Sequence, residues 1–377
     1  MKNILVNASN LHTGGAVAVA TSTVKELSIL KPTGLVISLL LSSEVNNNLS
    51  SMGVDLSVFK KVIVKDYFGI AAIWNGLYHD LAGYDAVLTV FGPAYTFKKV
   101  SKHVVGFAQP NIIYPNNPIF ENLNFFNKLK DRTQYLIQEY FFNKSSELVV
   151  ELDHVKQGIE RRGFFGGKRI NVVNSAVDAI YKNRYVWSQL RIDEEKSVLK
   201  IGIISRNYPH KNLNILPEVK RLLLSDFEIE SEFYVTFTDQ EFSGCSTMFQ
   251  SEINNVGPLK LNQCPSFYEQ MDGVIFPSLL ECFSAVPIES MIIKKPLFAS
   301  DLPFIRDCCD AHANYFDPLD AYSIAHSIWF FYNKSKKEQG EFIAGAYEFV
   351  KRYPGPDLRA LSYIEIIKRI LNSDNKF

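Results

Sequence analysis

The first half of the chain alternates short apolar runs with longer stretches of mixed polar and apolar character. Short apolar runs bounded by polar or turn residues are typical of buried strands. We expect strands over 3–7, 34–41, 86–90, 104–108, 147–150 and 170–173, and helices over 15–30 and 124–143. Alternation of this kind indicates a parallel sheet that helices cover on both faces.

The same alternation begins again in the second half of the chain. Strands are predicted over 198–205, 232–238, 273–276 and 296–299, and helices over 213–224 and 357–371. A polar stretch over 178–197 interrupts the pattern, so we place the joint between two domains there. We therefore predict an α/β protein of two Rossmann-like domains, 1–178 and 179–356, with a C-terminal helix within 357–377. Ligands of such folds bind beyond the carboxyl ends of the strands.

Composition and charge narrow the class of protein. Of the 377 residues, 47% are hydrophobic and 21% are charged, as in soluble globular proteins. Basic and acidic residues both number 40, so no net charge favours nucleic acid as a partner. The longest apolar run, 34–41, is too short to cross a bilayer, and the N-terminus does not resemble a signal peptide. Five cysteines without CxxC spacing favour a reducing cytoplasm.

Two glutamates flank a predicted strand-to-helix turn. Glu281 follows the strand 273–276, and Glu289 lies in the helix that Pro287 begins. The N-terminus of that helix presents free N–H groups and a positive dipole end, which can bind an anion. A carboxylate pair beside an anion site points to a ligand with hydroxyls and phosphates, such as a sugar nucleotide. An ordinary turn with solvated glutamates remains the alternative.

A basic turn follows the first strand of the second half. Arg206 offers a planar fork for phosphate oxygens, and Lys211 offers a mobile point charge five residues later. Both cations come after a strand of the same predicted sheet as Glu281, so together they can neutralise a diphosphate at one sheet edge. A solvated basic turn is the alternative, and the nearby glutamate turn weighs against it.

Together these residues resemble the family 4 retaining glycosyltransferases of the GT-B fold. The resemblance rests on Arg206 with Lys211 and on Glu281 with Glu289, and it extends to the segments 172–178, 256–258 and 315–318. It implies two Rossmann-like domains that face a central cleft, with the C-terminal helix crossing back to the first domain. It also implies transfer of a sugar, with retained configuration, from a UDP-sugar or GDP-sugar donor.

The resemblance assigns a role to each of the four charged residues. Glu289 would hold the ribose hydroxyls of the donor nucleotide, and Glu281 would lie near the hydroxyls of the donor sugar. Arg206 and Lys211 would bind the diphosphate and stabilise the charge that builds on it as it leaves. On this basis Arg206, Lys211 and Glu281 are the predicted catalytic residues.

The turn itself would complete the anion site. Backbone N–H groups of Phe283, Ser284 and Ala285 are predicted to contact the donor phosphates. The chain departs from the family pattern at Cys282, Ser284 and Asn212, where glycine is common. A side chain at Ser284 limits the approach of a ligand to the backbone or adds a hydroxyl donor to it. The pose of the donor is therefore less determined than the phosphate site.

The loop after the first predicted strand contains the pair Gly14 and Gly15. Paired glycines let backbone N–H groups approach a phosphate or sugar closely, although the full GxGxxG pattern is not present. In the resembling family this loop faces the donor, so both glycines are candidate contacts. A flexible turn in which Thr13 caps the following helix is the alternative.

Gln109 lies where many members of the resembling family place a histidine near the donor sugar. A glutamine still forms hydrogen bonds but cannot titrate. Our hypothesis is a donor sugar other than plain glucose, such as a 6-deoxy or N-acetylated sugar. The alternative, which is equally open, is that Gln109 only begins a loop.

We expect neither a metal nor another cofactor. The sequence contains no DxD motif and no histidine cluster with ligand spacing. Cationic side chains and the helix dipole would then act on the leaving diphosphate. The isolated histidines, such as His12 and His103, are expected to be structural or solvated.

Aromatic residues are dense over 114–142, and Lys128, Lys130 and Arg132 lie among them. One interpretation is an acceptor-side surface that touches an anionic membrane carrying a lipid-linked saccharide. The other is a core-facing helix with a solvated basic face.

The sequence thus predicts a cytoplasmic, metal-independent hexosyltransferase of surface polysaccharide synthesis, such as O-antigen, lipopolysaccharide or capsule. Its acceptor would be a saccharide or a polyprenyl-linked saccharide, with peripheral contact to the cytoplasmic face of the inner membrane. Alternatives on the same fold are a sugar-nucleotide epimerase, a phosphorylase and an inactive subunit that binds a sugar nucleotide.

Overall fold

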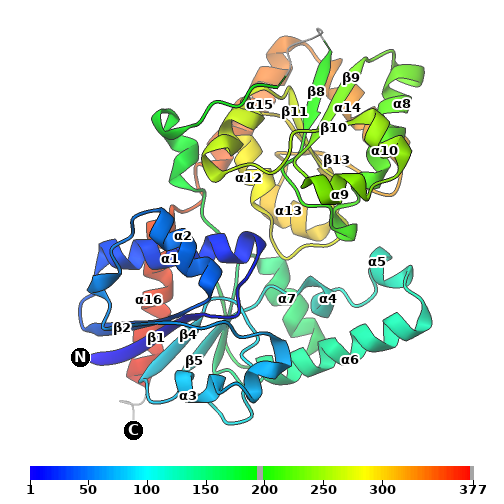
Figure 1. Ribbon diagram of the computed structural model, residues 1–377. Helices are drawn as coiled ribbons and strands as arrows, with labels where there is room; N and C mark the ends of the chain where they lie inside the picture. Colours follow the sequence, from blue (N-terminus) through cyan, green and yellow to red (C-terminus); the bar gives the residue numbers. More distant parts are fainter. Residues whose placement is uncertain (193–197, 374–377) are drawn as a thin grey trace. The chain divides into compact units, whose positions relative to one another are not determined.

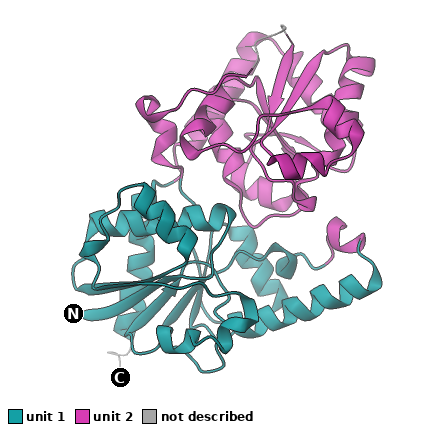
Figure 2. Cartoon of the chain, viewed as in Figure 1, with its two compact units in different colours: residues 1–115, 123–176, 354–377 teal, residues 116–122, 177–353 magenta. Residues whose placement is uncertain are grey.

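The computed structural model describes residues 1–192 and 198–373, and the chain divides into two compact units (Figure 2). Unit 1 comprises residues 1–115, 123–176 and 354–377, and unit 2 comprises residues 116–122 and 177–353. Residues 193–197 of the predicted joint and residues 374–377 of the predicted C-terminal segment lie outside the described residues. Each unit has its own parallel sheet, and the two are described in turn.

Within its described residues, unit 1 contains a seven-stranded parallel sheet with the order β3-β2-β1-β4-β5-β6-β7. The strands are β1 (Lys2–Ala8), β2 (Leu35–Leu41), β3 (Lys61–Val64), β4 (Ala86–Thr89), β5 (His103–Gly106), β6 (Glu147–Val150) and β7 (Ile170–Val172). The helices are α1 (Gly14–Leu30), α2 (Ser43–Ser51), α3 (Leu77–Leu81), α4 (Pro110–Ile113), α6 (Phe125–Phe142), α7 (Asp153–Arg162) and α16 (Pro356–Asn372), with 3-10 turns η1 (Leu56–Val58) and η2 (Gly69–Ile73). The order reverses between β1 and β4, which is the doubly wound topology.

Helices cover both faces of the central strands of unit 1. Val6 and Leu39 belong to a core cluster that also contains residues of α1 and, from α16, Ile367. Leu5 and Leu40, the adjacent positions of the same strands, belong to a second cluster on the opposite face. Successive residues of a strand point to opposite faces, so two buried faces require a continuous apolar run. Figure 1 shows α16, the last helix of the chain, beside α1 in this unit.

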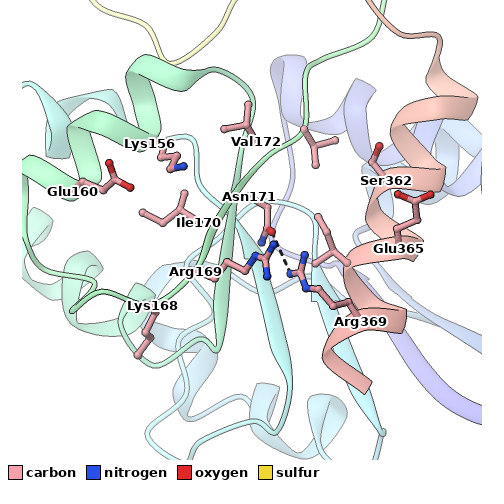
Figure 3. Close-up of a pocket in the computed structure, with 12 residues that line it drawn as sticks. Lys156, Glu160, Lys168, Arg169, Ile170, Asn171, Val172, Ser362, Glu365 and Arg369 are labelled. Carbon is pink, nitrogen blue, oxygen red and sulfur yellow. Dashed lines mark hydrogen bonds between the residues drawn. The ribbon is translucent and has the colours of Figure 1, made fainter. Parts of the chain in front are cut away.

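The edge of the same sheet holds α16 through polar contacts. Arg369 donates a hydrogen bond to Asn171 Oδ1 of β7 at 3.1 Å (Figure 3). Arg369 also forms an ion pair with Glu147 of β6. A pocket of about 860 Å³ lies here beside β7, between α7 and α16. As far as the chain is described, its lining contains none of the residues predicted for the functional site.

Buried polar side chains link three neighbouring strands of unit 1. Asn7 Nδ2 donates to Thr89 Oγ1 at 3.1 Å, and His103 Nε2 lies 2.8 Å from the same hydroxyl. Burial lowers the pKa of His103 from 6.5 to about 4. This histidine is therefore neutral at physiological pH and has a structural position in the sheet, as expected from its isolation in the sequence.

We expect the free energy of unfolding to fall as the pH drops from 6.5 towards 4. In this range the unfolded chain binds a proton on His103 and the folded chain does not, so acid favours unfolding by on the order of 2–3 kcal/mol. His103→Gln removes the titration, and urea denaturation between pH 4 and 7 should show a flatter profile. His79→Gln, at an exposed histidine, is the control. An unchanged profile in His103→Gln would refute this origin of acid sensitivity.

Within its described residues, unit 2 contains a six-stranded parallel sheet with the order β10-β9-β8-β11-β12-β13. The strands are β8 (Leu199–Gly202), β9 (Ser231–Val235), β10 (Ile253–Asn255), β11 (Gly273–Phe276), β12 (Leu297–Ser300) and β13 (Asn314–Phe316). The helices are α5 (Pro118–Glu121), α8 (Leu216–Phe227), α9 (Asp239–Ser243), α10 (Thr247–Glu252), α11 (Cys264–Glu269), α12 (Ala285–Ile292), α13 (Pro303–Cys309), α14 (Ala321–Tyr332) and α15 (Lys336–Val350). The 3-10 turns are η3 (Ala179–Lys182), η4 (Arg184–Val186), η5 (Pro209–Lys211), η6 (Leu213–Ile215) and η7 (Leu261–Gln263).

The predicted fold class, an α/β protein with two parallel sheets, is confirmed. The edge strands β3 and β10 are missing from the prediction because their apolar runs are short: β3 offers only Val62, Ile63 and Val64, none fully buried, and β10 offers only Ile253. The strand predicted over 198–205 ends at Gly202, and the helix predicted over 213–224 begins at Leu216 after a 3-10 turn.

The cysteines behave as small apolar residues. All five have free thiols, and four of them, Cys264, Cys282, Cys308 and Cys309, are buried. A search of the described helices finds no segment long and apolar enough to cross a bilayer.

Candidate functional site

The predicted site residues fall into two groups, one in each unit. Unit 2 contains Arg206, Lys211, Glu281, Phe283, Ser284, Ala285 and Glu289, and unit 1 contains Gly14, Gly15 and Gln109. In unit 2 the residues follow β8 and β11, which are neighbours in the sheet. Because parallel strands end at the same edge, the basic turn and the glutamate turn meet beyond their carboxyl ends.

Lys211 and Glu281 form an ion pair at this edge. Lys211 Nζ donates to Glu281 Oε1 at 2.5 Å, although 70 residues separate them in the sequence. The two side chains are only 14% and 12% exposed, so solvent screens this pair less than a surface pair. The Lys211 ammonium also lies 5.2 Å from the centre of the Phe276 ring, at the end of β11. The sequence-predicted cation and carboxylate are thus brought together.

Two further polar groups contact Glu281. Ser278 Oγ donates to Glu281 Oε1 at 3.2 Å, and His210 Nε2 lies 3.7 Å from the same oxygen. Burial lowers the pKa of His210, and the nearby Glu281 opposes this shift. A neutral imidazole at pH 7 leaves Lys211 as the cation of this cluster. All three contacts use the same carboxylate oxygen, Oε1.

Arg206 is anchored by a glutamate that the sequence analysis did not identify. Its Nε donates to Glu241 Oε1 and Oε2 at 2.8 and 2.9 Å, while 52% of the Arg206 side chain is exposed. Burial tends to raise the pKa of Glu241, but hydrogen bonds from Thr238 and Arg206 hold it below its usual range. Both bonds to Arg206 use Nε, so the terminal Nη groups are the ones suited to a phosphate.

Glu289 has a different environment from Glu281. Tyr268 donates its hydroxyl to Glu289 Oε2 at 2.9 Å. Burial raises the pKa of Glu289 to about 7, the hydroxyls of Tyr268 and Tyr181 lower it, and the nearby Asp178 raises it further. At neutral pH the carboxyl group is therefore divided between its charged and neutral forms. The two glutamates of the turn have distinct partners, Lys211 for Glu281 and Tyr268 for Glu289.

The turn into α12 offers backbone N–H groups. Ser284 is the N-cap residue of this helix, and its side chain makes no capping hydrogen bond. Its φ of −139° is extended backbone, so no glycine is required there. Asn212 has a φ of +55°, a left-handed conformation that asparagine tolerates better than most residues, and its side chain donates to Pro318 O at 2.7 Å. The departures from the family glycines are thus compatible with the backbone.

In unit 1 the glycine loop is open. Gly14 and Gly15 are both exposed, and a Cβ built on either residue would meet no atom within 4 Å. Gly14 has a φ of +72°, which favours glycine. Thr13 is the N-cap residue of α1, as the alternative interpretation expects, but its side chain makes no capping hydrogen bond. His12 is fixed by Tyr67 O, 3.0 Å from its Nε2, and by stacking on Phe68.

Gln109 lies three residues beyond the end of β5. It is the N-cap residue of the short helix α4, it makes no side-chain capping bond, and it is half-buried. The strand predicted to extend to Ala108 ends at Gly106. Gln109 therefore occupies a loop at the carboxyl edge of the unit 1 sheet.

Sequence reasoning missed Glu241 and Tyr268 as partners in unit 2. Glu241 carries a signal, because Thr238 and Glu241 form a capping box at the start of α9. Tyr268 carries none, since it is one of many aromatic residues in apolar segments. Among the described residues no group of three or more His, Cys, Asp and Glu side chains could hold a metal ion.

Comparison with known proteins supports the fold. No family model matches the chain. The model of the chain superposes on a sucrose-phosphate synthase from Thermosynechococcus elongatus with a TM-score of 0.71 and 11% identity, over 99% of this chain and 100% of the other. It superposes on Anabaena Alr3699/HepE, solved in complex with UDP and glucose, with a TM-score of 0.69 and 14% identity, over 98% and 100%. The chain has the GT-B fold.

A curated relative adds a sequence similarity. The chain is 22% identical over 200 residues to an O-antigen chain mannosyltransferase, RfbU, of Salmonella typhimurium. The match covers 52% of this chain and 54% of that protein, so it spans about half the length of each. The resemblance to GT-B glycosyltransferases that the sequence indicated is thus confirmed at the level of fold.

Proposed function

We propose that the protein is a retaining glycosyltransferase that transfers a sugar from a nucleotide-diphosphate donor to a saccharide or lipid-linked saccharide. The observation that carries the proposal is the cation cluster of unit 2, which consists of Arg206 and Lys211, both after β8. Lys211 is paired with Glu281, which follows the neighbouring strand β11, and Arg206 is anchored by Glu241, which follows β9 on the other side. Two cations at the carboxyl edge of a parallel sheet suit a diphosphate. HepE, a structural neighbour, was solved with UDP and with UDP-glucose.

The proposed reaction breaks the bond between the anomeric carbon of the donor sugar and the diphosphate oxygen. Negative charge builds on the diphosphate, and Lys211, Arg206 and the N–H groups of residues 283–285 stabilise it. The acceptor hydroxyl oxygen bonds to the anomeric carbon on the face that the diphosphate leaves, and its proton passes to a phosphate oxygen of the donor. The products are a nucleoside diphosphate and a glycoside with the donor configuration.

Glu281 and Glu289 have supporting roles in this proposal. Glu281 uses Oε1 for Lys211, so Oε2 is the oxygen suited to a hydroxyl of the donor sugar. Glu289 anchors the ribose. The proposed donor is a UDP-sugar or GDP-sugar used without a metal. O-antigen or capsule synthesis in the cytoplasm is the proposed setting, supported by the similarity to RfbU.

Release of nucleoside diphosphate from a panel of UDP-sugars and GDP-sugars tests this function, with saccharide and lipid-linked acceptors. We expect release that depends on an acceptor, and proton NMR of the product should show a retained anomeric configuration. An inverted linkage would overturn the retaining assignment. Isomerisation of the donor without an acceptor would identify an epimerase, and a requirement for inorganic phosphate would identify a phosphorylase.

The affinity for the donor nucleotide should rise as the pH increases from 6 to 8. The pKa of Glu289 is raised to about 7, so this change converts the carboxyl group to the carboxylate, which is the stronger acceptor for ribose hydroxyls. Titration calorimetry should show roughly a threefold to tenfold lower Kd at the higher pH. Glu289→Gln should remove the pH dependence, whereas Glu252→Gln, in α10, should keep it. A pH-independent Kd in the wild type would argue against the ribose role.

A further inference from the structure

Unit 1 exposes an unusual number of large apolar side chains around α6. Phe125 and Phe126, at the start of the helix, are 73% and 79% exposed. The surface, which we call the α6 face, consists of Phe125, Phe126, Leu129, Leu136, Ile137 and Tyr140 of α6 with Ile70 of η2 and Phe97, whose ring lies 5.9 Å from that of Phe141 in α6. Scattered single apolar residues are ordinary on a protein surface, but a cluster of this size indicates a binding surface.

A groove joins the two parts of the α6 face. A pocket of about 590 Å³ is lined by Ile70 and Tyr95 on one side and by Phe126, Leu129 and Ile137 of α6 on the other. The α6 positions follow helical spacing, so they form one stripe along the helix. The apolar side chains of η2 and α6 are therefore contiguous around a single groove.

In the described chain, the N-terminal part of α6 does not pack into the core. The buried residues of this helix, Gln138, Glu139, Phe141 and Phe142, all lie in its last five positions. Asn124 caps the N-terminus through a hydrogen bond to the N–H of Asn127, so the helix is formed up to its exposed end. The interpretation of this segment as a core-facing helix is therefore wrong for its first three turns.

Basic residues surround the apolar side chains. Lys128, Lys130 and Arg132 lie on the exposed part of α6, and Lys98 and Lys99 follow Phe97 directly. On α6 the acidic residues are Asp131 and Glu139, and Glu139 is ion-paired with Arg162 of α7. The chain as a whole has a formal net charge of zero, so this excess of positive charge is a local property. Exposed aromatic and aliphatic side chains with interleaved lysines suit the interface of an anionic bilayer.

We propose that the α6 face docks on an anionic lipid bilayer, with Phe125, Phe126 and Leu129 inserted among the acyl chains and the lysines at the phosphate groups. The inference rests on the proposed function, because a membrane-docked unit 1 would meet an acceptor that is itself attached to a lipid. A lipid chain also fits the chemistry of the groove between η2 and α6, whose lining is mostly apolar.

Vesicle sedimentation with the full chain tests this proposal. Vesicles of phosphatidylcholine with phosphatidylglycerol should bind the protein at least roughly tenfold more tightly than phosphatidylcholine alone, and added salt should weaken the binding. Phe125→Ser/Phe126→Ser should lower the partition coefficient roughly tenfold or more on anionic vesicles. Leu224→Ser/Met248→Ser, which removes two exposed apolar side chains from a groove in unit 2, is the matched control and should bind like the wild type.

Three outcomes of these experiments would contradict docking of the α6 face on an anionic bilayer. Equal binding to both kinds of vesicle, or none, would overturn the proposal. So would a dimer of the wild type in light scattering that Phe125→Ser/Phe126→Ser dissociates, since the occupant would then be a second copy. Thermal shift with UDP and GDP on the same samples separates the two claims. Loss of vesicle binding with a normal nucleotide response is a failure of docking alone, and no nucleotide response in the wild type is a failure of the proposed function.

Discussion

Lys211→Met is expected to lower the turnover of sugar transfer by roughly 10²–10³-fold, with a similar effect for Arg206→Met. The Lys211 ammonium, held by Glu281 at 2.5 Å and largely buried, would lie against the diphosphate as its negative charge develops. Methionine keeps most of the length and apolar stem of lysine but removes the charge. The rate of nucleoside diphosphate release under saturating donor measures this effect, because a group that acts on the leaving diphosphate changes kcat as well as KM.

The control separates catalysis from stability. Lys211→Met leaves Glu281 partly buried without its cation, which itself destabilises the turn. Lys211→Met/Glu281→Gln removes both charges, so it should recover most of the melting temperature but none of the turnover. Lys220→Met, which removes a cation of similar exposure paired with Glu232 and Glu252, should leave turnover unchanged. Full turnover in Lys211→Met would remove Lys211 from the mechanism.

Gly106→Ala is expected to destabilise unit 1 by at least about 3 kcal/mol. A Cβ at this position would lie 1.8 Å from the backbone carbonyl oxygen of Val90, whereas real Cβ atoms essentially never lie closer than 3.0 Å to such an atom. The oxygen belongs to the backbone beyond β4, so relief requires a shift of the segment that follows this strand. The predicted consequence is a melting temperature roughly 6–12 °C below that of the wild type.

Gly340→Ala provides the comparison for this prediction. Gly340 lies inside α15, and a Cβ there would meet no atom within 4 Å. Alanine is the better helix former by about 0.5–1 kcal/mol, so this variant should be equally or more stable than the wild type. Scanning calorimetry of both variants measures their melting temperatures. Equal values for the two would contradict the close packing of β5 against the segment after β4.

Much of the fold could be predicted because the central strands are buried on both faces. Runs such as 273–276 and 148–150 are apolar from end to end, and the structure places β11 and β6 over these positions. The edge strands β3 and β10 give a weaker signal, because the apolar run of β3 has only three residues, none fully buried, and that of β10 is a single isoleucine. The ends of the strands are also less certain, because Ile203 and Ile204 continue the apolar run beyond Gly202, where β8 ends.

The site was harder to predict than the sheet. The sequence indicates that Lys211 and Glu281 lie at one sheet edge, but their ion pair depends on the register of β8 against β11. The partner of Arg206 is Glu241, which the sequence presents only as part of a helix cap. The partner of Glu289 is a buried tyrosine, and apolar segments contain many of these. These side-chain pairs depend on three-dimensional positions, which the spacing of residues in the sequence does not determine.

The central claim is that the cation cluster of unit 2 binds a nucleoside diphosphate without a metal. Thermal shift with UDP, GDP and the corresponding monophosphates, in the presence and absence of EDTA, tests it most directly. We expect UDP or GDP at about 100 times its Kd to raise the melting temperature of the wild type by roughly 5 °C, unaffected by EDTA. The monophosphate and the Lys211→Met variant should each show a much smaller shift. If neither diphosphate raises the melting temperature, or if EDTA abolishes the shift, the account is contradicted.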